Sequence, residues 1–175
     1  GLDKSNVVIL GGTGPVGVAS AVICAKAGAS VRLVGRSIEK AEKTAAICND
    51  RYESKNVMAG MDADKQDYLN DADIVLNTGA AGIQLMTDDN VQMSKNLKIC
   101  ADTNAVPPSG IAGVDVMDSG KIMEKSPNKC LGIGALAIGN VKYKSQHECL
   151  KLMYTSDDPV YLDFEDAFKF AQKSV

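Results

Sequence analysis

The stretch Val7-Val8-Ile9-Leu10-Gly11-Gly12-Thr13-Gly14-Pro15-Val16-Gly17 decides the expected fold of this chain. Its first four residues are apolar and β-branched or leucine, which predicts a buried strand. A cluster of glycines ends that run, and residues 18–27 have the composition of a helix. A strand, a tight turn and a helix in direct succession are the context in which the spacing G-x-G-x-x-G indicates a dinucleotide site.

The three glycines of this motif are expected to have different tasks. Gly12 allows the turn, Gly14 lets a pyrophosphate approach the backbone, and Gly17 lets the helix pack tightly on the strand. The N–H groups at the start of that helix then face the phosphates. The predicted cofactor contacts in this loop are Gly12, Thr13, Gly14, Pro15, Val16 and Gly17. The alternative is a glycine-rich turn that binds no ligand.

The end of the second strand indicates which dinucleotide is bound. Residues 30–34 are expected to form a strand that ends in Gly35-Arg36-Ser37. NAD sites usually place an acidic residue there to bind the ribose hydroxyls, and this chain has none. Arg36 offers a planar, permanent cation that suits a phosphate, with Ser37 and Lys40 close behind it. We therefore predict that the chain binds NADP, with NAD as the weaker alternative. The competing interpretation is that Arg36 is a solvated loop charge and that Ser37 only caps the helix.

Composition limits the classes of protein to which this chain can belong. Its 175 residues, 45% of them hydrophobic and 23% charged, suit one globular domain spanning residues 1–175. A net charge of −3 without a basic stripe argues against nucleic acid, and no membrane span or signal peptide is visible. Five scattered cysteines and one histidine predict buried, reduced thiols in a cytoplasm and no metal site.

Strand-like and helix-like segments alternate along the whole chain. Strands are expected at residues 6–10, 30–34, 56–61, 72–77, 97–101 and 130–133, and helices at 15–27, 37–52, 64–69, 141–154 and 163–173. This alternation predicts an α/β fold with a doubly wound, mostly parallel sheet of the Rossmann type. The expected inner face of the second helix is Ala41, Ala45, Ile47 and Cys48. Four further apolar residues are assigned either to the core or to a subunit contact: Leu85, Met86, Val91 and Met93.

Ligands of such sheets bind beyond the carboxyl ends of the strands. The strand at 72–77 runs into Thr78, Gly79, Ala80 and Ala81, whose small size lets the backbone approach a ribose or a nicotinamide. The strand at 97–101 runs into Asp102 and Asn104, which we expect at the mouth of the crevice. For Asp102 a capping or turn-forming role is an equal alternative.

At this point the chain resembles a known family. The shared motifs, in the same order, are Gly11 to Gly17, Gly35-Arg36-Ser37, Thr78-Gly79-Ala80, the string from Ala101 to Ile111, and Leu131 to Leu136. They are similar to those of NADP-dependent methylene-tetrahydromethanopterin dehydrogenases, some of which also act on methylene-tetrahydrofolate. The string D-x-N-A-x-P-P-x-G-I is more specific than the glycine loop, and the similarity covers nearly the whole chain.

The resemblance implies that the methylene group on a reduced pterin is oxidised to the methenyl form while a hydride passes to NADP. No proton leaves in that step, so holding the reactants together suffices and no base is needed. By resemblance Ala135 contacts the cofactor and Lys142, at the start of a helix, faces the pterin or the nicotinamide; a solvated lysine is the alternative. His147 is interpreted as a surface or boundary residue and not as a catalytic one.

The family also has an N-terminal domain that helps to form the pterin cleft, and we do not expect that domain within this sequence. Either the chain is a cofactor domain excised from a larger, homo-oligomeric protein, which we favour, or it is a shortened member of the family. Two other functions stay open. One is an NADP(H)-binding sensor or scaffold without turnover. The other is the cofactor domain of a different NADP dehydrogenase, such as the shikimate type, which the D-x-N-A-x-P-P string disfavours.

Overall fold

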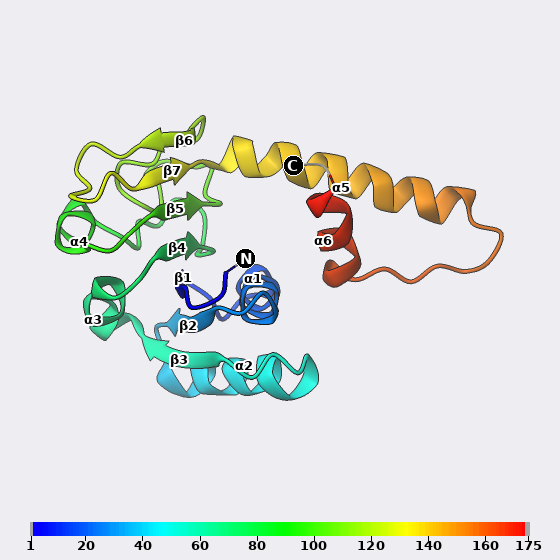
Figure 1. The fold of residues 1–175 in the computed structure, drawn as a ribbon, viewed down its shortest axis with the longest axis horizontal. Helices are drawn as coiled ribbons and strands as arrows, with labels where there is room; N and C mark the ends of the chain where they lie inside the picture. The colour runs from blue at the N-terminus through cyan, green and yellow to red at the C-terminus, as the bar shows by residue number, and fades with distance from the viewer. Residues whose placement is uncertain (1, 174–175) are drawn as a thin grey trace.

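A seven-stranded sheet lies at the centre of the computed structural model, which describes residues 2–173 (Figure 1). Its strands are β1 (Asn6–Leu10), β2 (Ser30–Gly35), β3 (Val57–Met61), β4 (Ile74–Asn77), β5 (Ile99–Asp102), β6 (Ser119–Ile122) and β7 (Leu131–Ile133). They lie in the order β3-β2-β1-β4-β5-β7-β6. All neighbours are parallel except β6, which runs antiparallel to β7 at the edge. The predicted doubly wound α/β fold is confirmed.

Helices cover both faces of the sheet. They are α1 (Pro15–Lys26), α2 (Ile38–Arg51), the 3-10 turn η1 (Asp62–Asp64), α3 (Lys65–Asn70), α4 (Asp88–Met93), α5 (Ala135–Thr155) and α6 (Phe164–Gln172). In Figure 1, α3 and α4 lie to the left of the sheet, α1 and α6 lie to its right, and α2 lies at its lower end beside β3. None of the helices described is long and apolar enough to span a membrane.

The alternating side chains of β1 build both halves of the core. Val7 and Ile9 belong to one buried cluster, with residues of α1 and α2, whereas Val8 and Leu10 belong to the other, with residues of α3 and α4. All four are at most 2% exposed. A parallel strand covered on both faces needs apolar residues at successive positions, which explains the uninterrupted run from Val7 to Leu10.

The strand order fixes where a ligand can bind. From β1 the chain first builds β2 and β3 on one side, and then β4, β5 and β7 on the other. Leu10 is in register with Val34 of β2 and with Asn77 of β4, so these three strands end at one edge of the sheet. The topological switch between β1 and β4 is the usual place for the ligand crevice in such folds.

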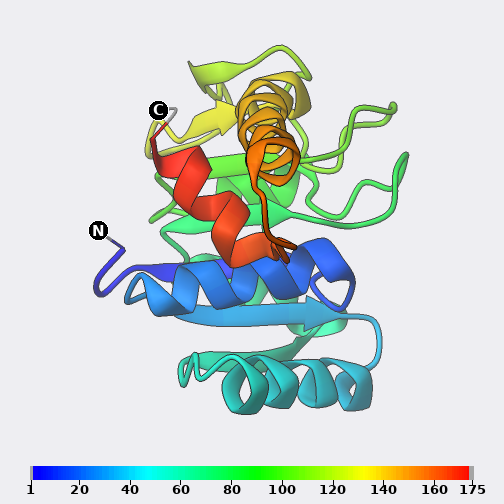
Figure 2. The same cartoon turned by 90° about the vertical axis from the view of Figure 1, so that its right-hand side faces the viewer.

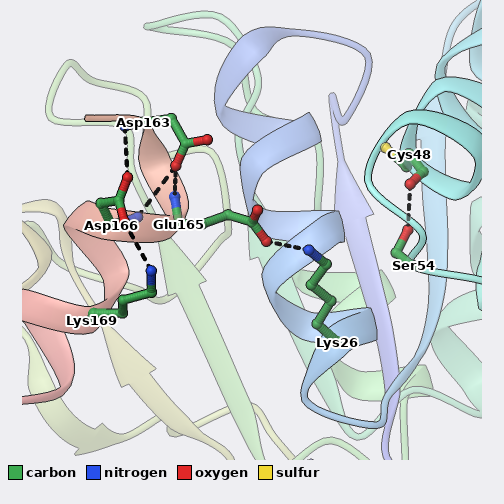
Figure 3. A network of polar contacts seen from close by, with 7 residues as sticks. All are labelled: Lys26, Cys48, Ser54, Asp163, Glu165, Asp166 and Lys169. Carbon is green, nitrogen blue, oxygen red and sulfur yellow. Dashed lines mark hydrogen bonds and ion pairs between the residues drawn. The ribbon is translucent and has the colours of Figure 1, made fainter. Parts of the chain in front are cut away.

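Polar contacts join the C-terminal helix α6 to α1 and to α5. Lys26 of α1 forms an ion pair with Glu165 of α6, and the Asp163 carboxylate caps α6 by accepting the N–H of Glu165 at 2.8 Å (Figure 3). The Ser145 hydroxyl of α5 donates to the carbonyl of Ala167 at 2.6 Å. These contacts place α6 between α1 and α5, while the far end of α5 extends beyond the sheet (Figures 1 and 2).

The structure corrects three predictions about the helices. The helix expected at residues 141–154 begins already at Ala135, because the N–H of Gly134 is held by the carbonyl of Asp118 at 2.8 Å and Gly134 caps the helix. Lys142 therefore lies two turns inside α5 and not at its start. Ile47 is 49% exposed, and Thr44 takes its place on the buried face of α2. The spacing of Ala41, Thr44, Ala45 and Cys48 is the helical one.

Two elements were not expected, and one assignment was left open. Strand β6 and helix α4 lie in segments where no regular element was predicted. Met86 and Val91 are core residues, whereas Met93 is 55% exposed. Leu85 packs partly buried against the core.

A pair of isoleucines tests this assignment of the core. Replacing Ile9, which is fully buried in β1, with alanine removes methylene groups and leaves a cavity, so the free energy of unfolding should fall by about 2–5 kcal/mol. Ile47→Ala on the exposed face of α2 should change it by less than about 0.5 kcal/mol. Urea denaturation measures both, and equal losses would contradict the packing described.

Candidate cofactor site

A hollow of about 520 Å³ lies at the carboxyl edge of the sheet, over the switch between β1 and β4. Seven of the predicted cofactor residues line it: Thr13, Gly14, Arg36, Lys40, Thr78, Gly79 and Ala80. Six others complete its wall: Gly11, Val34, Gly35, Asp62, Ile83 and Leu85. The ends of β1, β2, β3 and β4 therefore meet in one place, as the strand-end argument requires.

The glycine loop makes its sharp turn at Gly11, not at Gly12 as predicted. Gly11 has a φ of 65°, in the left-handed region that glycine tolerates. A Cβ atom there would also lie 2.5 Å from the Cα of Gly79, so the loops after β1 and β4 touch. Gly12 is needed for packing, because its Cβ would lie 2.8 Å from Cγ of Leu33.

The other two glycines of the motif differ in their surroundings. At Gly17 a Cβ would lie 2.1 Å from the carbonyl oxygen of Gly12, so only glycine lets α1 approach β1 this closely. At Gly14, the N-cap of α1, a Cβ would have no atom within 4 Å, and no side chain caps the helix. The backbone around Gly14 is thus open on the side of the hollow. This open cradle at a helix N-terminus fits a phosphate group.

Two cations stand at the end of β2. Arg36 and Lys40 are exposed and line the hollow, and within residues 2–173 their side chains make no hydrogen bond or ion pair. Ser37 caps α2, since its hydroxyl accepts the N–H of Lys40 at 3.3 Å and donates to Glu39 at 3.1 Å. The capping role foreseen for Ser37 is therefore real, and the two cations are free to meet an anion.

Asp62 is a lining residue that the sequence analysis missed. It directly follows β3 and contributes a carboxylate to the hollow, where it pairs with Lys65 at 3.2 Å. The strand-end rule applied to residues 57–61 would have found it, because Asp62 directly follows β3 as Arg36 follows β2 and Thr78 follows β4.

Asp102 and Asn104 lie beside the hollow and are not among its lining residues. Asp102 is 1% exposed and Asn104 7%, and both side chains are engaged in hydrogen bonds within the chain. Asn77, which donates a hydrogen bond to Asp102 and is fully buried at the end of β4, was not predicted as a site residue. The bonds of Asp102 agree with the structural alternative that the sequence left open for it.

The remaining predicted residues surround the hollow or lie away from it. Gly12 and Gly17 are buried beneath the hollow, and Ser37 caps α2 at its rim. Pro15 and Val16 are exposed on the first turn of α1, and Ala81 is exposed in the loop after β4. Ala135 is the first residue of α5. Lys142 instead lines an apolar groove between α5 and α6, together with Cys149 and Phe168. His147 is exposed, so its interpretation as a surface residue is confirmed.

Four of the five free thiols are buried, and Cys149 is partly exposed. Burial raises the pKa of the Cys24 thiol to about 11. A hydrogen bond with Cys130, at 3.5 Å between the sulfur atoms, and burial also raise the pKa of Cys100, whereas the same hydrogen bond lowers the pKa of Cys130. Within residues 2–173, no three or more His, Cys, Asp or Glu side chains gather to hold a metal ion. What the hollow offers is a phosphate cradle, two cations and a wall of small residues.

Comparison with curated proteins supports the family resemblance. Over 97% of its length the chain is 37% identical to an NAD(P)-dependent methylenetetrahydromethanopterin dehydrogenase of Methylorubrum extorquens, of which it covers 58%. It is also 37% identical to the bifunctional protein MdtA of the same organism, over 83% of this chain and 50% of that protein. The chain thus spans little more than half the length of these relatives. No family model matches it.

Solved structures confirm the fold. Quinate dehydrogenase from Corynebacterium glutamicum, in complex with NAD, superposes over 99% of this chain and 56% of its own, with a TM-score of 0.58 and 15% identity. Shikimate dehydrogenase of Mycobacterium tuberculosis superposes over 95% of this chain and 56% of its own, with a TM-score of 0.55 and 13% identity. At such identities the likeness concerns architecture alone.

Two glycines of the loop make a matched test of its geometry. Gly17→Ala forces the new methyl group into the backbone of Gly12, so the free energy of unfolding should fall by about 1–3 kcal/mol. Gly14→Ala meets no atom and should change stability by less than about 0.5 kcal/mol. Chemical denaturation of the two variants decides, and a stable Gly17→Ala would refute the close approach of α1 to β1.

Proposed function

We propose that this chain, homologous over nearly its whole length to methylenetetrahydromethanopterin dehydrogenases, is the NADP-binding part of an oxidoreductase acting on a methylene-tetrahydropterin. One observation carries the choice of cofactor. The end of β2, where an NAD site usually has a carboxylate, presents the exposed cations Arg36 and Lys40. The relative's name, which states dependence on NAD(P), agrees with a dinucleotide in this hollow.

The shape of the hollow suits an extended dinucleotide. The pyrophosphate would lie against Gly14 at the N-terminus of α1, above the centre of the sheet. The adenosine half would then lie over β2 and β3, beside Gly35, Arg36 and Asp62. The nicotinamide half would lie over β4, against Thr78, Gly79 and Ala80. This orientation follows the order of the strands on the two sides of β1.

A 2′-phosphate on the adenosine ribose would meet Arg36. Its guanidinium can donate two parallel hydrogen bonds to phosphate oxygens, and Lys40 adds a second positive charge one turn into α2. The two charges act without competition from an internal ion pair, since within the described residues neither has one. NAD, lacking that phosphate, would lose these contacts and bind more weakly.

The proposed chemistry is the acceptance by NADP of a hydride from the methylene group of a reduced pterin, which becomes a methenyl cation stabilised by its two flanking nitrogens. The chain's own residues would contribute positioning. Gly79 and Ala80 let the backbone lie close to the ring that receives the hydride, and the rigid strand ends fix its place. Lys142, on a different surface, stays a prediction for the pterin side.

The proposal also includes turnover of the substrate by the whole protein, the identity of that substrate, and assembly into a homo-oligomer. The relatives contain further residues beyond the 58% and 50% of their lengths that this chain covers, and we propose that a second domain there completes the pterin cleft. Whether tetrahydromethanopterin or tetrahydrofolate carries the methylene group is decided by assaying NADPH formation with each.

The free cysteines support a cytoplasmic location, and exposed Tyr143 and Leu150 on α5 support a homo-oligomer.

The variant Arg36→Ala tests the cofactor assignment. Loss of a charge-assisted contact to the 2′-phosphate should weaken NADP binding by about 1.5–3 kcal/mol and leave NAD nearly unchanged. Isothermal titration with each dinucleotide measures the two affinities.

Arg51→Ala is the matched control, because Arg51 lies at the other end of α2, over the ring of Tyr52. It should alter neither affinity. If Arg36→Ala weakened the binding of NADP and of NAD equally, Arg36 would not bind the 2′-phosphate, and the assignment would be wrong.

A further inference from the structure

Two loops beyond the carboxyl edge are joined by backbone hydrogen bonds, from the N–H groups of Leu85 and Met86 to the carbonyl of Gly110, and also by buried polar side chains. The β4 loop (residues 78–87) and the β5 loop (residues 103–112) project beyond the sheet in Figure 2, in green. The β4 loop supplies Thr78, Gly79, Ala80, Ile83 and Leu85 to the hollow, whereas the β5 loop supplies none of its lining residues. The shape of one wall of the hollow therefore depends on what holds the β4 loop from behind.

Asp102, at the end of β5, is the centre of this fastening. Its Oδ1 accepts hydrogen bonds from Nδ2 of Asn77 at 2.7 Å and from the N–H of Asn104 at 2.9 Å. Its Oδ2 accepts the N–H of Ile111 at 3.0 Å. A carboxylate that is 1% exposed is costly unless it is hydrogen-bonded in this way, and these bonds use both of its oxygens.

Asn104 ties the two loops together directly. Its Oδ1 accepts the N–H of Gly82 in the β4 loop at 3.2 Å and that of Val106 in the β5 loop at 2.9 Å. Its Nδ2 donates to the carbonyl of Pro108 at 2.8 Å. One amide thereby connects three backbone positions that no strand pairing holds.

Asn77 carries the connection into the hollow. While its Nδ2 donates to Asp102, its Oδ1 accepts the N–H of Gly79 at 3.1 Å, and Gly79 is a lining residue. Gly110 makes room for this arrangement, since a Cβ there would lie 1.7 Å from Nδ2 of Asn77. The contacts from Asn104 through Asp102 and Asn77 to Gly79 are therefore continuous.

We propose that Asn77, Asp102 and Asn104 are positioning residues that set the wall for one half of the cofactor only. This inference rests on the proposed function, in which the nicotinamide half lies over β4. The three side chains contact the loops after β4 and β5, and none contacts Arg36, Lys40 or Asp62 on the other side of β1. Asp102 and Asn104 thus act behind the β4 loop and do not touch the cofactor themselves.

The affinities for two ligands distinguish the contributions of the two halves of the proposed cofactor site. NADP occupies both, whereas adenosine 2′,5′-bisphosphate contains only the adenosine half with its 2′-phosphate. Asn104→Ala should weaken NADP binding by about tenfold or more, as expected from the loss of the side-chain hydrogen bonds to Gly82, Val106 and Pro108. It should leave the affinity for adenosine 2′,5′-bisphosphate within about twofold of the unchanged protein. Isothermal titration gives both affinities.

Two further variants keep the test decisive. Asn104→Asp retains an oxygen for the N–H groups of Gly82 and Val106, so it should lose less NADP affinity than Asn104→Ala, and it serves if the alanine variant does not fold. Asn96→Ala removes an asparagine side-chain bond of a different loop, from Nδ2 of the exposed Asn96 to the carbonyl of Asn70 at 2.9 Å, near the amino end of β5. It should change neither affinity.

The outcomes are distinguishable. An Asn104→Ala variant that loses both ligands equally, or that is only less stable with an unchanged ratio of affinities, would overturn the positioning role. If the unchanged protein bound NADP and adenosine 2′,5′-bisphosphate but no substitution altered their ratio, the inference would fail and the proposed function would stand. If the unchanged protein bound neither ligand, the proposed function would fall and the inference with it.

Discussion

The contact between Gly17 and the backbone of Gly12 is the constraint on which the site depends. It brings the start of α1 against the end of β1, closer than any side chain would allow. That approach sets the uncapped N-terminus of α1 at the centre of the carboxyl edge. Because β1 is paired with β2 on one side and with β4 on the other, whatever binds at Gly14 can reach the ends of both neighbouring strands.

The two sides of that centre differ in chemistry. On the side of β2 stand the exposed charges of Arg36 and Lys40, which suit an anionic group in solvent contact. On the side of β4 the residues that line the wall are mostly apolar, and the shape of the wall depends on buried hydrogen bonds behind it. Charge therefore selects one half of the ligand, whereas backbone position accommodates the other half.

The strands and helices closest to the glycine loop were predictable because local patterns determine them. Asn6–Leu10 has the bounds that its apolar run predicts, and Ser37 caps α2 as its residue type suggests. The start of α5 was missed because its cap, Gly134, is fixed by the distant Asp118, and β6 was missed because all its residues are exposed. Asn77 and Asp102 acquire their roles only through hydrogen bonds between separate strands, which no sequence pattern reports.

A thermal-shift titration of the chain with NADP and with NAD, side by side, tests the central claim most directly. A ligand at a hundred times its dissociation constant should stabilise the fold by about 2.7 kcal/mol, which is a shift of several degrees for a domain of this size. The account predicts that NADP produces this shift at a much lower concentration than NAD. Equal responses to the two dinucleotides, or no response to either, would contradict it.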